Sequence, residues 1–370
     1  MTEYRRQHFI PKFYLKNFSE DKKALCRYSL KNKMSERSNI SKACTARDFY
    51  AKAEAADFEK TMSGLEAVHA KIVRKIVTER SLALISEEEF LHLCNFVLLM
   101  KTRDKASKKE IEKMENLLLD WLKPSFAQSE EAKEKGITLE DLKKVRLTRD
   151  SANFEAMLIA MKGAPLIADL TATLLINKTK RPFITCDSPV LFTNYVTVDA
   201  RRGNMGYLSR GLMIFLPLTE EITLWLFDAT FYEPDANSKG NVNVTRKQDI
   251  SALNRLQIII ADEYVFFSKP DDRDYVLLLH DERCANQRAM YSSPIVANAP
   301  PEIHEQMSDL SHKKIRRKHR FSFFETNERT IQHFQKIAAD PRHLSYALYR
   351  NEELARTAFS ELEEIGKAGG

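Results

Sequence analysis

The stretch of sequence that decides the fold lies near the N-terminus and reads Gln7-His8-Phe9-Ile10-Pro11-Lys12-Phe13-Tyr14-Leu15-Lys16-Asn17-Phe18. A chain terminus is usually loose unless burial ties it down. The apolar residues of this stretch predict that it docks on the core, which carries His8 and Lys12 to the body of the protein. If the stretch is helical, Pro11 suits the first helical position and Lys12 falls one turn from His8.

A second informative stretch reads Phe183-Ile184-Thr185-Cys186-Asp187-Ser188-Pro189-Val190. Together the two stretches resemble the bacterial family of domain of unknown function 4238, and the resemblance extends over roughly residues 7 to 268. Weaker matches are Asp48-Phe49-Tyr50, Lys101-Thr102-Arg103, Pro217-Leu218-Thr219 and the segment from Asn254 to Ser268. The chain departs from the family at Cys186, where Ser is usual, and near Met100, where Gln is frequent. The resemblance implies a fold and a candidate site, but no reaction.

Composition sets broad limits on the kind of protein. The 370 residues include 58 Lys or Arg and 52 Asp or Glu, and this net charge of +6 does not by itself establish a nucleic-acid partner. The five cysteines contain no Cys-x-x-Cys pair, so neither a structural zinc site nor a disulfide framework is expected. No secretory signal and no apolar run long enough to span a bilayer occur, so we expect a cytoplasmic protein without a membrane partner.

The hydrophobic pattern predicts an α+β fold, with a central, mostly antiparallel sheet, a block of long helices packed on it and C-terminal helices. Helices are expected over 55–80, from the Ser86/Glu89 capping box to Lys123-Pro124 with or without a break, over 154–161, and from Asp249. Strands are expected at 23–30, 43–52, 172–177, 183–185, 212–216, 222–227, 264–267 and 275–280, with a loop at 32–40. We expect residues 1–298 to form one domain, with the helical block at about 55–163, and residues 299–370 to add a basic segment and helices at 325–338 and 341–366.

Four residues are candidates for a catalytic site. His8 titrates near neutral pH and suits a general acid or base, and Asp187 follows a strand and would orient it or bind a metal. Lys12 and Arg103 would stabilise the charge of a phosphoryl transition state. Each has a structural alternative: a core histidine, a turn-capping aspartate, a solvated lysine, and an arginine paired with Asp104 or Glu66.

Gln7, Lys101, Asn254 and Glu66 are supporting polar candidates, and Asn254 also suits a structural clamp on an apolar helix face. The strongest charge cluster follows residue 311 and is flanked by Phe321, Phe323 and Phe324. Its six cationic residues suit contacts to nucleic-acid phosphates, or alternatively a solvated linker. They are Lys313, Lys314, Arg316, Arg317, Lys318 and Arg320.

Two functions are compatible with these residues. The first is a hydrolase acting on RNA or DNA, a ribonuclease-type effector in an antiphage or toxin setting, for which Mg²⁺ is the candidate metal. The second is a non-catalytic module binding nucleic acid or protein, in which His8, Asp187 and Asn254 form a structural polar network. Phosphate-binding loops, dinucleotide fingerprints and the common hydrolase motifs are absent from the sequence. Oligomeric state cannot be read from the sequence.

Overall fold

The computed structural model describes residues 6–47, 55–146, 157–158, 160–196, 206–285, 321–339 and 349–353. The strands are β1 (Arg6–His8), β2 (Ala24–Ser29), β3 (Met34–Asn39), β4 (Thr45–Arg47), β5 (Thr171–Asn177), β6 (Thr185–Cys186), β7 (Leu191–Asn194), β8 (Leu212–Pro217), β9 (Ile222–Phe227), β10 (Tyr232–Pro234), β11 (Val242–Val244), β12 (Tyr264–Phe267) and β13 (Phe324–Thr326).

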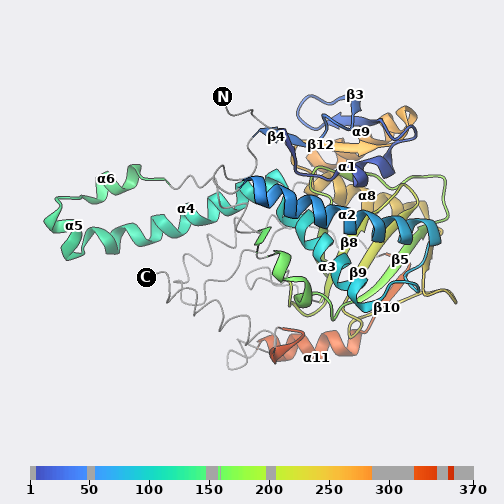
Figure 1. Ribbon diagram of the computed structural model, residues 1–370. Helices are drawn as coiled ribbons and strands as arrows, with labels where there is room; N and C mark the ends of the chain where they lie inside the picture. The colour runs from blue at the N-terminus through green and yellow to red at the C-terminus, as the bar shows by residue number, and fades with distance from the viewer. Residues whose placement is uncertain are drawn as a thin grey trace.

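The α-helices are α1 (Lys12–Leu15), α2 (Ala55–Glu79), α3 (Glu87–Thr102), α4 (Lys105–Ala127), α5 (Glu130–Glu134), α6 (Leu139–Lys144), α8 (Lys247–Ile260), α9 (Arg273–Ala285) and α11 (Glu328–Ala339). Short 3-10 turns are η1 (Lys16–Phe18), η2 (Ala164–Leu166) and η4 (Pro270–Asp272). Figure 1 shows these elements along the chain.

Two sheets form the centre of the fold. One has the strand order β11-β5-β9-β8-β7 and the other β3-β2-β12-β6. Only the β11–β5 pairing is parallel among these described strands; the others are antiparallel. The α+β class, the antiparallel character and the C-terminal helix are therefore confirmed, with the antiparallel strands divided between two sheets.

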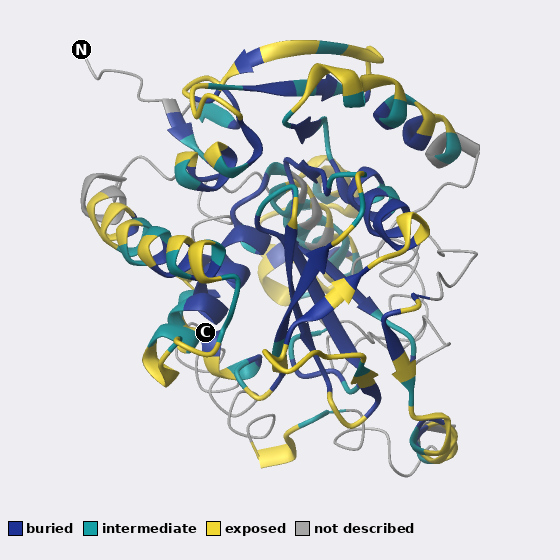
Figure 2. Cartoon of the chain, turned by 90° about the vertical axis from the view of Figure 1, so that its right-hand side faces the viewer, coloured by how far each residue is buried: buried dark blue, intermediate teal, exposed yellow. Residues whose placement is uncertain are grey.

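The five-stranded sheet separates two apolar cores. Leu174, Ile214 and Leu224 point into one core, whereas their chain neighbours Leu175 and Trp225 point into the other. This alternation follows from the two-residue period of a strand. Figure 2 shows the central strands mostly in the dark blue of buried residues, and β8 and β9 are buried throughout. Residues of the N-terminal segment, α2 and α3 belong to the first core, and residues of α8, α9 and the 321–334 segment to the second.

The N-terminal stretch docks as the sequence predicts. Phe9, Tyr14 and Phe18 are buried, and the ring of Tyr14 lies 6.4 Å from that of Phe96 on α3. Pro11 occupies the capping position before α1 and not its first helical position, because its backbone is extended. The segment therefore belongs to the first core.

Most predicted elements are present, and three differ in an instructive way. The Ser86/Glu89 capping box starts α3 as expected. Residues 34–39, expected as loop, form the edge strand β3. Residues 275–280, expected as a strand, lie in α9, where Val276 and Leu279 are buried while Leu278 is exposed, a helical spacing of inward residues. Helix α4 runs three residues beyond Pro124.

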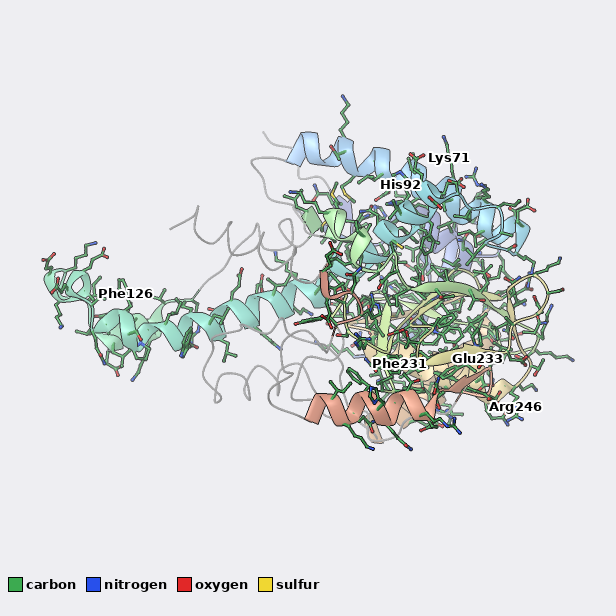
Figure 3. All side chains as sticks on the ribbon, turned by 90° about the horizontal axis from the view of Figure 1, so that it is seen from below. Lys71, His92, Phe126, Phe231, Glu233 and Arg246 are labelled. Carbon is green, nitrogen blue, oxygen red and sulfur yellow. The ribbon has the colours of Figure 1, made fainter. Side chains whose placement is uncertain are left out.

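Helices α4, α5 and α6 form an arm that projects from the body (Figures 1 and 3). Asp104 caps the start of α4 through its side chain, which accepts a 2.6 Å hydrogen bond from the backbone of Ser107. Near the far end, Lys123 donates to the carbonyl of Val145 over 2.8 Å, which ties α4 to the end of α6. The arm is thus fixed at its base and braced along its length.

Candidate functional site

His8 lies at the end of β1 and is half-buried. Its Nε2 is 3.4 Å from the carbonyl oxygen of Ile40. Burial, and next the charge of Lys12, lower the pKa of His8 below its usual value. The imidazole is therefore mainly neutral at pH 7. Lys12 lies exposed on the adjacent α1.

Arg103, at the end of α3, contacts two other predicted site residues, His8 and Glu66. Its guanidinium donates over 2.7 Å to the carboxylate of Glu66 on α2 and over 2.6 Å to the backbone carbonyl of His8. Arg103 is only 3% exposed, so this fork holds β1, α2 and α3 together. The structure thus brings His8, Glu66 and Arg103 together, with a hydrogen bond to the His8 backbone and with the charges of Glu66 and Arg103 close enough to act on the His8 imidazole.

Asp187 caps the turn between α8 and β12. Its Oδ1 accepts from the backbone N–H of Asp262 over 2.9 Å, and its Oδ2 accepts from Glu263 over 2.8 Å and from Tyr264 over 3.0 Å. The residue is 3% exposed. Burial raises the pKa of Asp187 to about 7, while the three N–H donors act in the opposite direction.

These contacts decide how well Asp187 suits a magnesium ion. Mg²⁺ needs carboxylate oxygens that it can reach, and both oxygens of Asp187 already face N–H groups. The predicted role of Asp187 as a metal ligand does not fit this donor set. Among the described residues, no group of three or more His, Cys, Asp or Glu side chains is placed to hold a metal ion.

The corner between α3 and α4 links the surroundings of His8 and Asp187. Arg103 contacts His8, while the next residue, Asp104, accepts a hydrogen bond from the hydroxyl of Ser188, which follows Asp187. Asp104 is fully buried, and burial raises the pKa of its carboxyl. The direct proximity of the His8 ring to the Asp187 carboxylate stays a prediction.

Lys101 precedes this corner and is buried, with its Nζ 5.9 Å from the centre of the Phe192 ring. Its carbonyl accepts a 2.6 Å hydrogen bond from the Ser107 hydroxyl at the start of α4. Gln7 is buried on β1, where it pairs with Ala46 of β4. Both residues therefore lie inside the packed part of the fold.

Asn254 and its neighbour Gln257 clamp the conspicuous 183–190 stretch onto α8. The Asn254 amide accepts from Ile184 N–H over 3.1 Å and donates to the Pro182 carbonyl over 2.8 Å. Gln257 donates to the Pro189 carbonyl over 2.9 Å. The sequence did not identify the contacts that Gln257 and Ser188 make, nor the capping role of Asp104. Of these three residues, only Asp104 has a local sequence signal for its role, because it is an aspartate directly before a helical pattern.

The cationic residues Lys313 to Arg320 and the Asp48-Phe49-Tyr50 match lie outside the described residues. The structure does describe residues 321–339, which follow directly after the cationic run. Phe321, Phe323 and Phe324 are buried in the second core. Between them Ser322 donates through its backbone N–H, over 3.0 Å, and through its hydroxyl to the carboxylate of Asp249.

The helices of the described residues include none with the length and apolar character needed to cross a membrane. Comparison with curated proteins and with solved structures gives no match. The family model of a protein of unknown function, DUF4238, matches residues 6–271, which include both stretches that carry the resemblance. With most of its length matched, the chain belongs to the DUF4238 family.

Proposed function

We propose that this protein is a non-catalytic module that binds nucleic acid through the cationic run Lys313–Arg320. The observation that carries the proposal is the anchoring of the residues directly after the run. The three phenylalanines and the Ser322–Asp249 hydrogen bonds fix the chain from residue 321, the position directly after the last residue of the run. Cationic side chains in sequence contact phosphates without reading bases.

The surroundings of Asp187 and Asn254 support a binding function over catalysis. The side chains of Asp187 and Asn254 form hydrogen bonds with backbone groups of segments packed against them. Networks of this kind specify a unique core when every member has a partner. A role in fixing the fold therefore explains the contacts of Asp187 and Asn254 without requiring a substrate.

Salt-dependent binding tests this proposal. Replacing Arg316, Arg317 and Lys318 with Ala should weaken binding of labelled RNA and duplex DNA alike, and should reduce the slope of log affinity against log salt by roughly one unit per lost phosphate contact. A control variant removes the same charge from three exposed lysines, Lys133, Lys144 and Lys180. A salt slope equal to that of the control would assign the run to a solvated linker.

A second candidate is a ribonuclease-type hydrolase, as an effector in antiphage defence or a toxin system. It is favoured by the half-buried His8, whose lowered pKa leaves it able to accept a proton at pH 7, beside the cationic Lys12. The test incubates total RNA and DNA with the protein, with EDTA or with magnesium. Cleavage lost in His8→Ala and kept in the exposed-histidine control His333→Ala would support it; equal cleavage by both variants would exclude His8.

A further inference from the structure

Besides the cationic run, positive charge also gathers near the N-terminus. Residues 12–42 carry nine Lys or Arg and three Asp or Glu, a surplus of six that equals the net charge of the whole protein. The segments 7–19 and 37–47 contain no acidic residue. These residues lie in the described part of the structure, which allows their arrangement to be followed.

Four exposed lysines of this region, Lys12, Lys16, Lys22 and Lys42, are named here the lysine strip. Lys12 and Lys16 lie one helical turn apart, because the N–H of Lys16 donates to the carbonyl of Lys12. The Nζ of Lys22 donates to the carbonyl of Lys16 over 3.1 Å, which places a third lysine beside the second.

His8 connects the fourth lysine to the strip. Its ring nitrogen reaches the carbonyl of Ile40, and the N–H of Phe9 donates over 2.9 Å to the carbonyl of Cys44, so the 40–44 loop that carries Lys42 lies against the start of the N-terminal stretch. On the other side Lys12 is close enough for its charge to lower the pKa of His8. The lysine strip therefore runs past a half-exposed imidazole.

Three acidic residues near the strip pair with arginines, whereas the exposed Glu20 takes part in no ion pair among the described residues. Asp21 pairs with Arg37 and accepts backbone N–H groups, Glu36 pairs with Arg27, and Glu66 pairs with Arg103. Within the described part of the chain, none of the four strip lysines takes part in an ion pair. Within the described residues, no acidic side chain neutralises the charges of these four lysines through an ion pair, so an external anion can do so.

We propose that the lysine strip binds the phosphodiester backbone of nucleic acid, as a second contact in addition to that of the cationic run. This inference rests on the proposed nucleic-acid-binding function and names a folded surface for it. Among the aromatic residues of the N-terminal stretch, Phe9, Tyr14 and Phe18 are buried, and the partly buried Phe13 packs against Phe96, so their rings are held by the core and not presented to bases. Recognition through the strip is therefore electrostatic and independent of base sequence.

The experiment measures fluorescence anisotropy of labelled RNA and duplex DNA across a salt series. The strip variant carries Lys12→Gln, Lys16→Gln, Lys22→Gln and Lys42→Gln. Its matched control carries Lys133→Gln, Lys144→Gln, Lys180→Gln and Lys239→Gln, which removes the same charge from exposed lysines elsewhere. All eight side chains are exposed, so both variants should melt like the parent protein.

The strip variant should bind at least roughly tenfold more weakly than its control at low salt, with a salt slope smaller by about three units. Equal binding by the strip variant and its control, while the Arg316/Arg317/Lys318 variant loses affinity, overturns the strip alone. No binding by the parent protein overturns the proposed function and the strip together. Binding only to vesicles that contain phosphatidylserine overturns both in favour of a membrane surface.

Discussion

At the scale of single residues, the contacts of Asp187 show a structural role for this carboxylate. The sequence allowed two interpretations of this carboxylate, a group presented to a cleft or a cap on a turn. The amides it caps lie some 75 residues later in the chain, so no local pattern could decide between them. Its burial and its three N–H donors identify the cap.

Asp187→Asn should destabilise the protein, because an amide cannot accept from all three N–H groups without turning its own NH₂ group toward one of them. We expect a loss of roughly 1–3 kcal/mol in the free energy of unfolding, measured by urea denaturation. The exposed Asp271→Asn is the control and should unfold like the parent. Equal urea midpoints for the two variants would show that the carboxylate does not stabilise the fold and would make it a ligand candidate again.

At the scale of helices and strands, prediction succeeded where the signal is local. Ser86 and Glu89 are three residues apart and determine the start of α3 by themselves. The 275–280 run contains mostly apolar residues whose strand and helix patterns overlap over six positions. Packing against the distant β2 places it in α9, as the 2.9 Å contact between the Tyr28 hydroxyl and His280 shows.

The contact of α2 with α3 predicts a pH dependence of stability. Burial, and next the charge of His92 on α3, lower the pKa of His69 on α2 to about 4. The unfolded chain protonates this imidazole near its usual pKa of about 6.5, whereas the folded protein resists protonation down to about pH 4. The free energy of unfolding should therefore fall as pH drops from 6.5 towards 4, by up to about 3 kcal/mol, because each tenfold change in proton affinity is worth about 1.4 kcal/mol.

Urea titrations between pH 7 and pH 4 measure this effect. His69→Gln should flatten the acid side of the stability profile, since glutamine does not titrate. His333→Gln, at an exposed position, should leave the profile as it is in the parent. Profiles of the same slope in both variants would mean that His69 is protonated equally in the folded and unfolded states.

At the scale of the whole molecule, sequence patterns predicted the fold class but not which segments share a core. Residues 321–339 lie some ninety positions after β10 in sequence, yet β13 pairs with that strand. The ring centre of Phe324 lies 5.3 Å from that of Trp225 on β9. Such a pairing depends on which apolar face is left uncovered by the rest of the fold, and that cannot be read from local spacing.

Phe324→Ala should therefore weaken the body of the protein and not only its C-terminal part. Truncating a buried phenylalanine costs roughly 3–5 kcal/mol. Water entering beside Trp225 should also shift its fluorescence to longer wavelength. Phe126→Ala, in the arm and 40% exposed, is the control and should leave both the unfolding midpoint and the emission near those of the parent. If Phe324→Ala changes neither the emission wavelength nor the unfolding midpoint, the segment 321–339 does not contribute to the core.

The projecting arm has a mechanical consequence. Its main helix has 23 residues, a length of about 34 Å at 1.5 Å per residue, and is held at one end by Asp104 and by the ion pair of Lys109 with Asp262. It is a lever whose fulcrum is the Arg103-Asp104 corner. A rotation of about 10° there would carry the far end through about 6 Å. A force on the tip therefore acts, amplified by the length of the helix, on the corner where Arg103 contacts His8 and Asp104 contacts Ser188.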